Sequence, residues 1–386
     1  MKNTAQRLQL VPSQFFAALN TKIAALQDAG REIIRLDIGS PDLPPAPHIV
    51  TALAQAAASA DNHGYQNHKG PAALRQAWAG MYQRVHGVEL DPESEIVPLL
   101  GSKEGIFHLA QAILDPGDVA LIPDPGYLTY ASGAILAGGR PYSLPLLPER
   151  YYLPDLTTIP PEILRRTRLL WLNYPNNPTA ATAPLEFFAA AVEFARQHGL
   201  LVCHDAAYSQ VTFEGYRAPS ILEVPGAKEV AVEFNSLSKS HNMAGWRVGA
   251  AVGNVQALKA LYAYKTNADS GHFLPIQQAA IAAMTGDQDW LAGRNEIYRQ
   301  RRDCVLSTLR ALGLDPATPK ASLYVWSPVP AGFTSAQFVS HLLEATGISL
   351  TPGTVFGQGG EGFVRIALSS PTEQINAAMQ RIRAIL

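Results

Sequence analysis

Short apolar runs alternate with longer amphipathic segments through the middle of the chain. Several of the short runs are apolar at successive positions, as in a strand that helices cover on both faces. The predicted strands are Ile96–Leu100, Val119–Ile122, Leu169–Leu172, Leu200–Cys203, Val230–Phe234 and Val248–Val252. The predicted helices between them include Glu104–Leu114, Leu185–His198 and Ala257–Tyr264. This alternation predicts an α/β fold in which a mainly parallel sheet lies between layers of helices.

The two ends of the chain have a different pattern. Residues 1–45 are predicted to hold a helix at about Ser13–Ala29, an extended segment at Ile33–Ile38 and a proline-rich turn. A long amphipathic helix is predicted from about residue 288 to Leu312. It is followed by predicted strands near Leu323–Trp326 and Val364–Ala367 and a predicted helix at Ser335–Ala345. We expect a large domain at residues 46–287 and a smaller α+β domain assembled from residues 1–45 and 288–386.

Composition narrows the class of protein. The 386 residues are 47% apolar and 16% charged, which is enough apolar material for a large core. The net charge of −2 argues against a nucleic-acid partner, which would require a basic domain. No apolar run approaches the roughly 20 residues of a membrane helix, and the N-terminus lacks the apolar stretch of a secretory signal. Cys203 and Cys304 are expected to be free thiols, so we expect a soluble, cytoplasmic protein without a membrane partner.

The segment at residues 236–249 is the most informative part of the chain. It lies between two predicted strands, at the edge of the sheet where α/β proteins form their sites. Ser238 and Ser240 flank Lys239, and Arg247 follows eight residues after the lysine. Hydroxyl groups and an arginine suit a phosphate dianion. A lysine beside such a site suits a Schiff base to pyridoxal phosphate, whereas a lone lysine would be a solvated surface residue.

This window of fourteen residues resembles, position for position, the pyridoxal-phosphate attachment signature of class I/II aminotransferases. The resemblance covers nearly the whole chain. It implies fold type I, with a mainly parallel seven-stranded sheet between helices in the large domain and a smaller α+β domain. It also implies pyridoxal 5'-phosphate as the cofactor and Lys239 as the residue that binds it covalently. Ser236, Ser238 and Arg247 are then expected to contact the cofactor phosphate.

Residues that follow other predicted strands supply the groups that the cofactor requires at its ring nitrogen and its phenolic oxygen. The ring nitrogen stays protonated beside a carboxylate, and Asp205 lies just past the strand Leu200–Cys203. By resemblance, Asp205 is the partner of the ring nitrogen, and Asn177 and Tyr208 contact the phenolic oxygen. Taken alone, Asp205 would be interpreted as a helix cap and Asn177 as part of an Asn-Pro turn.

The phosphate requires further donors. Residues 101–105 open a predicted helix directly after a strand, so their backbone N–H groups and the helix dipole form an anion site. The resemblance assigns Ser102 and Lys103 to this phosphate contact. It assigns Tyr127, which follows a Pro-Gly turn, to stacking on the cofactor ring; without the resemblance, Tyr127 would be interpreted as a packing residue.

Tyr65 bears on whether the protein forms a dimer. It is similar to a tyrosine that reaches the cofactor phosphate of the neighbouring subunit. The resemblance therefore implies a homodimer with shared active sites, and Ser270 is a second expected contact across the interface. The alternative is that Tyr65 is a tyrosine of an ordered surface loop.

Arg365 is the candidate for substrate binding. An amino acid presents an α-carboxylate, for which arginine offers a rigid pair of donors. Arg365 lies on a predicted strand, and the resemblance puts the carboxylate-binding arginine there, with Gly39 facing it and Asn177 also beside the substrate. The ten histidines show no metal-ligand spacing, so no metal is expected.

The resemblance implies a ping-pong transfer of an amino group between an L-amino acid and a 2-oxo acid. Lys239 moves the Cα proton, while Asp205 and Tyr208 support the cofactor. Within the class the pattern is closest to prokaryotic LL-diaminopimelate aminotransferases, which use 2-oxoglutarate in lysine biosynthesis. The motifs mainly hold the cofactor, so alternatives stay open: an alanine or aspartate aminotransferase, a pyridoxal-dependent β-lyase, or a pyridoxal-binding regulator.

Overall fold

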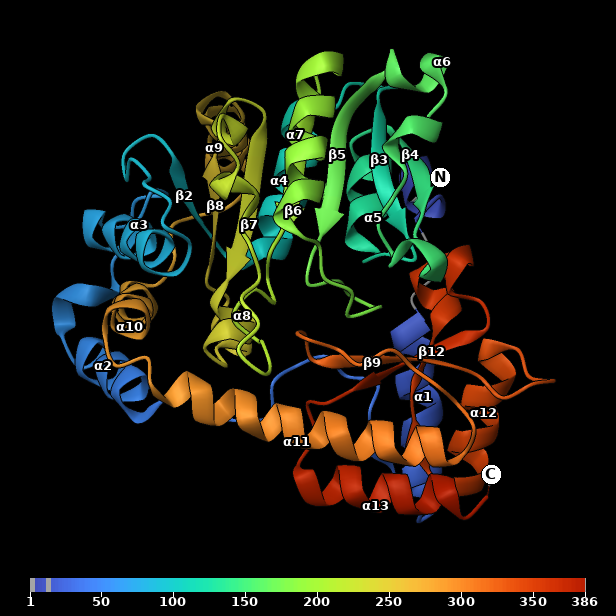
Figure 1. The fold of residues 1–386 in the computed structure, drawn as a ribbon. Coiled ribbons are helices and arrows are strands. Elements are labelled where there is room, and N and C mark those ends of the chain that lie inside the picture. The colour runs from blue at the N-terminus through green and yellow to red at the C-terminus, as the bar shows by residue number, and fades with distance from the viewer. Residues whose placement is uncertain (1–3, 12–14, 386) are drawn as a thin grey trace.

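A mixed seven-stranded sheet forms the centre of the larger part of the molecule in the computed structural model, which describes residues 4–11 and 15–385 (Figure 1). Its strands, in spatial order, are β2 (Ile96–Leu99), β8 (Gly249–Gly253), β7 (Ala231–Ser236), β6 (Leu201–Asp205), β5 (Thr167–Asn173), β3 (Val119–Asp124) and β4 (Arg140–Pro145). Strand β8 is antiparallel to both of its neighbours, and the other strands run in one direction. Their carboxyl ends therefore meet at one edge of the sheet.

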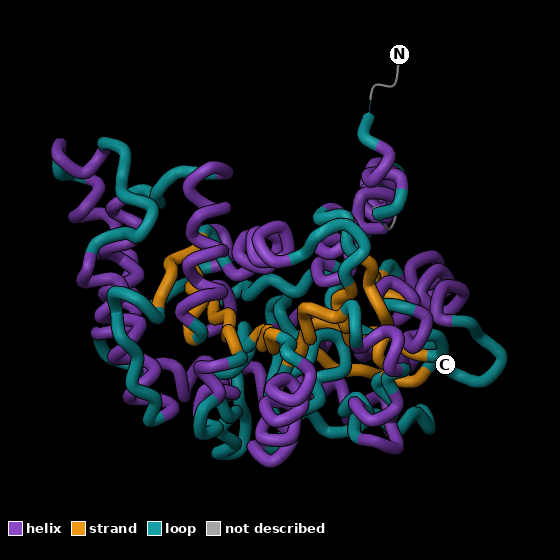
Figure 2. Tube along the Cα trace, turned by 90° about the horizontal axis from the view of Figure 1, so that it is seen from above, coloured by secondary structure: helices purple, strands orange, loops and turns teal. Residues whose placement is uncertain are grey.

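Helices cover both faces of this sheet, as Figure 2 shows from above. One face packs against α4 (Ser102–Ile113), α5 (Thr129–Leu136) and α9 (Val255–Ala268). The other packs against α2 (Pro47–Ala57), α3 (Ala72–His86), α7 (Leu185–His198) and α10 (Leu274–Thr285). Successive side chains of β5 alternate between the two cores, with Leu170 and Leu172 in one and Leu169 and Trp171 in the other. This explains why the central strands are apolar on both faces.

The smaller part brings the two ends of the chain together. Strands β11 (Thr351–Pro352), β12 (Phe363–Ala367) and β9 (Tyr324–Pro328) form an antiparallel sheet. Strand β1 (Ile34–Arg35) pairs in parallel with β10 (Ile348–Ser349). The helices here are α1 (Phe15–Asp28), α11 (Trp290–Ala311), α12 (Ser335–Thr346) and α13 (Thr372–Arg383). In Figure 1, α11 runs below the large sheet and continues across the smaller part, where α13 lies beneath it. Two single-turn helices, α6 (Pro161–Leu164) and α8 (Leu237–Ser240), complete the α-helices of the described residues, and short 3-10 turns lie between the elements.

The predicted α/β class and all of the predicted central strands are confirmed. Strand β4 was not predicted, because it lies at the edge of the sheet, has a mostly exposed surface and contains two prolines rather than an apolar run. The prediction that Asp205 lies past its strand was wrong, since Asp205 is the last residue of β6. Ser13, the predicted first residue of the N-terminal helix, lies outside the described residues.

The hydrophobic core of the smaller part extends beyond the predicted domain boundary. It contains Leu36 and Ile366 together with Val211 and Phe213, which follow strand β6 of the large sheet. The division at residues 46–287 stays a prediction. None of the described helices has both the length and the apolar character needed to cross a bilayer.

Candidate active site

A single cavity of about 860 Å³ lies at the carboxyl edge of the large sheet, and both parts of the molecule line it. Twelve of the predicted site residues line this cavity: Gly39, Ser102, Lys103, Tyr127, Asn177, Asp205, Tyr208, Ser236, Ser238, Lys239, Arg247 and Arg365. The two exceptions are the residues predicted to reach a partner subunit, Tyr65, which is 98% exposed, and Ser270, which is also exposed. The parallel strand ends therefore bring together segments that are far apart in the sequence.

Lys239 lies in α8, the single turn that follows β7. Its Nζ atom donates a hydrogen bond to the carbonyl oxygen of Gly39 at 2.5 Å. Burial, together with the positive charges of Arg365 and Arg247, lowers the pKa of Lys239 to about 8. This lowered pKa makes more of the amine neutral near neutral pH than in a free lysine, and the neutral form is what attack on a carbonyl group requires.

Asp205 is a buried carboxylate at the end of β6. It accepts a hydrogen bond from the Tyr130 hydroxyl at 2.8 Å, and its own carbonyl oxygen accepts one from the Asn173 amide at 2.7 Å. Burial raises the pKa of Asp205. No basic side chain of the described residues forms an ion pair with it, so it suits a cationic group supplied by a ligand, such as a protonated ring nitrogen.

The start of α4 forms an anion cradle. Gly101 caps the helix with a φ of 82° and no side-chain hydrogen bond to the first turn, so backbone N–H groups at this end have no capping side chain. A Cβ atom on Gly249 would lie 2.8 Å from the backbone nitrogen of Ser102, so glycine is needed where β8 passes this turn. Arg247 Nη1 donates to the hydroxyl of Ser238 at 3.3 Å. These groups fit a phosphate.

Arg365 is buried on the wall formed by the smaller part. Its guanidinium lies between the rings of Tyr324 and Phe356, with its central carbon 4.3 and 4.7 Å from the two ring centres. It donates to Asn177 Oδ1 at 2.9 Å and to the carbonyl oxygen of Asp37 at 2.8 Å. Because Asn177 accepts with its oxygen, its amide nitrogen is available to donate to a ligand oxygen.

The sequence patterns missed three residues that hold this geometry. Asn173 donates to the Asp205 carbonyl oxygen and accepts from the backbone N–H of Asn177, so it ties two strand ends together. Tyr130 supports the Asp205 carboxylate. Tyr324 shares a hydrogen bond of 2.8 Å with the Tyr208 hydroxyl. Asn173 belongs to the same strand-end segment as Asn177 and could have been identified there, whereas nothing in the sequence marks Tyr324.

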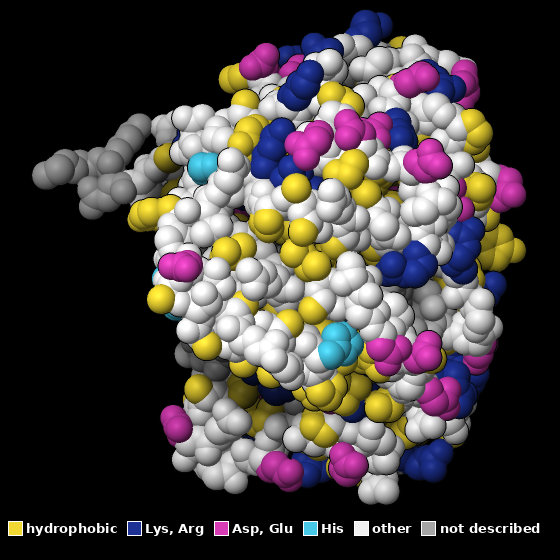
Figure 3. Space-filling view, turned by 90° about the vertical axis from the view of Figure 1, so that its left-hand side faces the viewer, with side chains coloured by type: hydrophobic (Ala, Val, Ile, Leu, Met, Phe, Trp, Pro, Cys, Tyr) yellow, Lys and Arg dark blue, Asp and Glu magenta, His cyan; other side chains and the backbone are white. Residues whose placement is uncertain are grey.

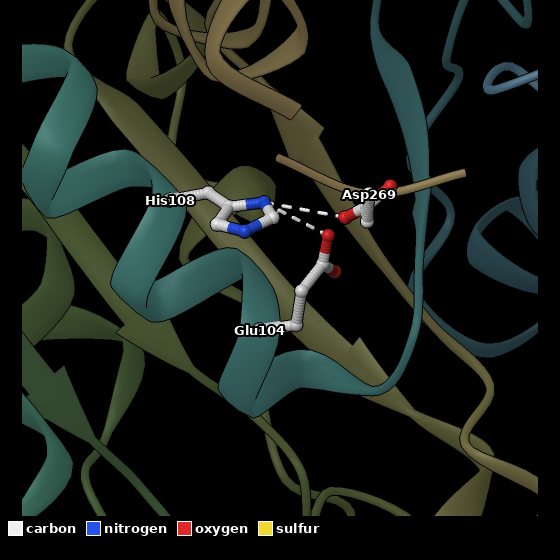
Figure 4. Close-up of side chains that lie close together, drawn as sticks. All are labelled: Glu104, His108 and Asp269. Atoms are coloured by element: carbon white, nitrogen blue, oxygen red, sulfur yellow. Dashed lines mark ion pairs between the residues drawn. The ribbon is translucent and has the colours of Figure 1, made fainter. Parts of the chain in front are cut away.

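Figure 4 shows Glu104 and His108 of α4 pointing toward Asp269, which follows α9. The grouping resembles a metal site, but Lys265 already supplies a cation: its ammonium donates to Glu104 at 2.9 Å and to Asp269 at 2.8 Å. Burial opposes ionisation of Glu104, but His108 and Lys265 lower its pKa to about 2. Glu104 also accepts the backbone N–H of Leu100, so this cluster braces the turn that begins α4.

The lysine, the uncompensated carboxylate, the anion cradle and the buried arginine in one cavity define a pyridoxal-phosphate enzyme that handles amino acids. The sequence pattern of the family "Aminotransferase class I and II" matches residues 31–382. The chain belongs to this family, whose members use pyridoxal 5'-phosphate to exchange an amino group between an amino acid and a 2-oxo acid.

Individual relatives agree with this assignment. The chain is 49% identical to LL-diaminopimelate aminotransferase of Moorella thermoacetica, over 99% of this chain and 98% of the relative. The solved structure of substrate-bound BacF from Bacillus subtilis has a TM-score of 0.96 and 38% identity, covering 100% of this chain and 98% of that one. A double mutant of Thermus thermophilus aspartate aminotransferase has a TM-score of 0.92 and 30% identity, covering 100% of both chains. The predicted family and fold type are thus confirmed.

Proposed function

We propose that this enzyme exchanges an amino group between LL-diaminopimelate and 2-oxoglutarate in lysine biosynthesis. The observation that carries this choice of substrate is similarity over nearly the full length, at 45–50% identity, to relatives named for that reaction. We further propose a cytoplasmic location, with which the two free thiols, Cys203 and Cys304, agree.

The cofactor, when bound, supplies an electron sink for the carbanion at the substrate Cα. We assign Lys239 to covalent attachment and to movement of the Cα proton, because its amine is buried and has a lowered pKa. Asp205 keeps the ring nitrogen protonated, and Asn177 and Tyr208 hold the phenolic oxygen. Ser102, Lys103, Ser236, Ser238 and Arg247 hold the phosphate, and Tyr127 stacks on the ring.

We assign substrate orientation to Arg365. The rings of Tyr324 and Phe356 hold the Arg365 guanidinium in place, so a substrate carboxylate meets donors that are already oriented. Gly39 lines the same cavity, and a Cβ atom at this position would lie 2.1 Å from the Tyr324 hydroxyl oxygen. Glycine at this position therefore keeps the backbone close to the site.

We also propose that the enzyme acts as a homodimer. Tyr65 is an almost fully exposed aromatic residue on the segment after α2, and Val50 of α2 and Phe273 before α10 are exposed as well. The side of the molecule seen in Figure 3 has hydrophobic side chains with few charges across its middle. Tyr65 and Ser270 are the residues we expect to reach the partner's site.

A half-reaction with single amino acids tests the substrate. Purified enzyme receives LL-diaminopimelate, L-glutamate, L-alanine or L-aspartate separately, and the visible spectrum follows conversion of the cofactor to its amino form. Rapid conversion by LL-diaminopimelate and glutamate alone supports the proposal. Conversion by aspartate without a response to LL-diaminopimelate would instead favour a second candidate function, that of an aspartate aminotransferase. The similarity to the Thermus thermophilus structure is the reason for considering this candidate.

A further inference from the structure

A further arginine, Arg35, lines the same cavity as Arg365 and Arg247. Arg35 of β1 uses Nε and Nη2 to donate to the two carboxylate oxygens of Asp37, both at 2.7 Å. Nη2 also donates to Asn20 Oδ1 of α1 at 2.9 Å. The side chain of Asp37 is fully buried, so this pair holds the guanidinium in a fixed orientation.

Asp37 connects Arg35 to Arg365. Arg365 donates to the backbone carbonyl oxygen of Asp37, while Arg35 binds its carboxylate. Two of the arginines that line the cavity therefore bind the same buried residue, Arg35 at its carboxylate and Arg365 at its backbone carbonyl oxygen. A ligand with a carboxylate at each end could meet one arginine with each end.

Arg35 keeps donors for a ligand. Its hydrogen bonds within the described residues involve Nε and Nη2, and none involves Nη1. Asn20 accepts through Oδ1, which leaves its amide nitrogen able to donate as well. One face of α1 continues this wall, because Phe16, Asn20, Ile23 and Gln27 recur at helical spacing and all line the cavity.

We propose that Arg35 Nη1 and the Asn20 amide form a subsite for the distal carboxylate of a long dicarboxylic amino acid. The inference rests on the proposed function, in which the substrate is LL-diaminopimelate. Asp37 balances the charge of Arg35, so the subsite recognises the carboxylate by directed hydrogen bonds more than by net charge. That suits a distal end that also carries an ammonium group.

Comparison of LL-diaminopimelate with L-lysine tests the subsite, because lysine lacks only the distal carboxylate. In the wild type, kcat/KM should favour LL-diaminopimelate, and Arg35→Gln should reduce this preference by about 10–100-fold, as expected for loss of charge-assisted bonds. Lys22→Gln, on α1 but paired with Glu344 away from the cavity, should leave the preference unchanged. An unchanged preference in a folded, cofactor-loaded Arg35→Gln enzyme would overturn the subsite.

Two additions keep the test decisive. The double variant Arg35→Gln/Asp37→Asn avoids a buried carboxylate without its partner and should show the same loss of preference. Binding of pimelate and heptanoate, measured by the spectrum of the cofactor without turnover, isolates the distal carboxylate from the reaction. Pimelate should bind about 10-fold more tightly than heptanoate in the wild type and equally in the variants. Equal binding in the wild type refutes the subsite, whereas failure to turn over LL-diaminopimelate refutes the proposed function.

Discussion

At the scale of single residues, Lys239 shows how charge placement prepares a reactive group. Burial and two nearby arginines lower its pKa to about 8, and the Gly39 carbonyl oxygen accepts a hydrogen bond from its amine. Since the neutral amine attacks the cofactor carbonyl, loading of pyridoxal phosphate onto cofactor-free enzyme should accelerate with rising pH and level off above about pH 8. Absorbance measured during loading gives this profile.

Removing one of the two arginine charges tests whether these charges lower the pKa of Lys239. In Arg365→Gln one positive neighbour is lost, so the ammonium form of Lys239 becomes less unfavourable and the pKa rises. The loading profile should therefore move to higher pH. Arg165→Gln, an exposed arginine outside the cavity, is the control and should leave the midpoint in place. A shift to lower pH in Arg365→Gln would contradict this electrostatic account.

At the scale of elements, the turn that begins α4 depends on the ion cluster behind it. Replacing Lys265 by methionine leaves Glu104 and Asp269 facing each other without the cation between them. We expect a loss of about 2–3 kcal/mol in the free energy of unfolding, below the range for a fully buried pair because both carboxylates are 15% exposed. Affinity for pyridoxal phosphate should fall as well, since Glu104 holds the backbone N–H before Gly101.

Urea unfolding and cofactor titration measure the two effects separately. Lys259→Met, on the exposed side of the same helix α9, is the matched control. If Lys265→Met lowers stability and leaves cofactor affinity at the wild-type value, the cluster stabilises the fold without supporting the phosphate turn.

The elements also show what the sequence could reveal. Lys239, Asp205 and Asn177 lie at or just after strand ends, where an α/β protein forms its site. The local pattern marked Lys239, whereas the resemblance to the family was needed to distinguish Asp205 from a helix cap and Asn177 from a turn residue. Edge strand β4 has no apolar run and stayed hidden. Tyr324 and Arg35 lie in the smaller part, where packing between distant segments sets which side chain faces the cavity. Such residues carry no local signal, because an arginine on a short strand and a tyrosine in a core are ordinary.

At the scale of the whole molecule, the prediction concerns exchange of residues between subunits. In a dimer with shared sites, Tyr65 of one chain serves the Lys239 site of the other. Tyr65→Ala and Lys239→Ala homodimers should both be severely impaired, the second while still retaining cofactor. A hybrid of the two has one site with native Lys239 and a native tyrosine from its partner, so a statistical mixture should regain about a quarter of wild-type activity.

The mixing experiment separates the two possible roles of Tyr65. If Tyr65 served its own subunit, neither site of a hybrid would be complete, and mixing would restore nothing. The test requires that the two variants exchange subunits and form hybrid dimers. Chains with different tags, purified on both tags in turn, demonstrate that hybrids are present. A mixture of Lys239→Ala with wild type, exchanged in the same way, controls for the activity of a dimer with one working site. Recovery in the mixture of Tyr65→Ala with Lys239→Ala, together with loss of activity in a hybrid of wild type and a chain that carries both substitutions, assigns the tyrosine to the partner's site.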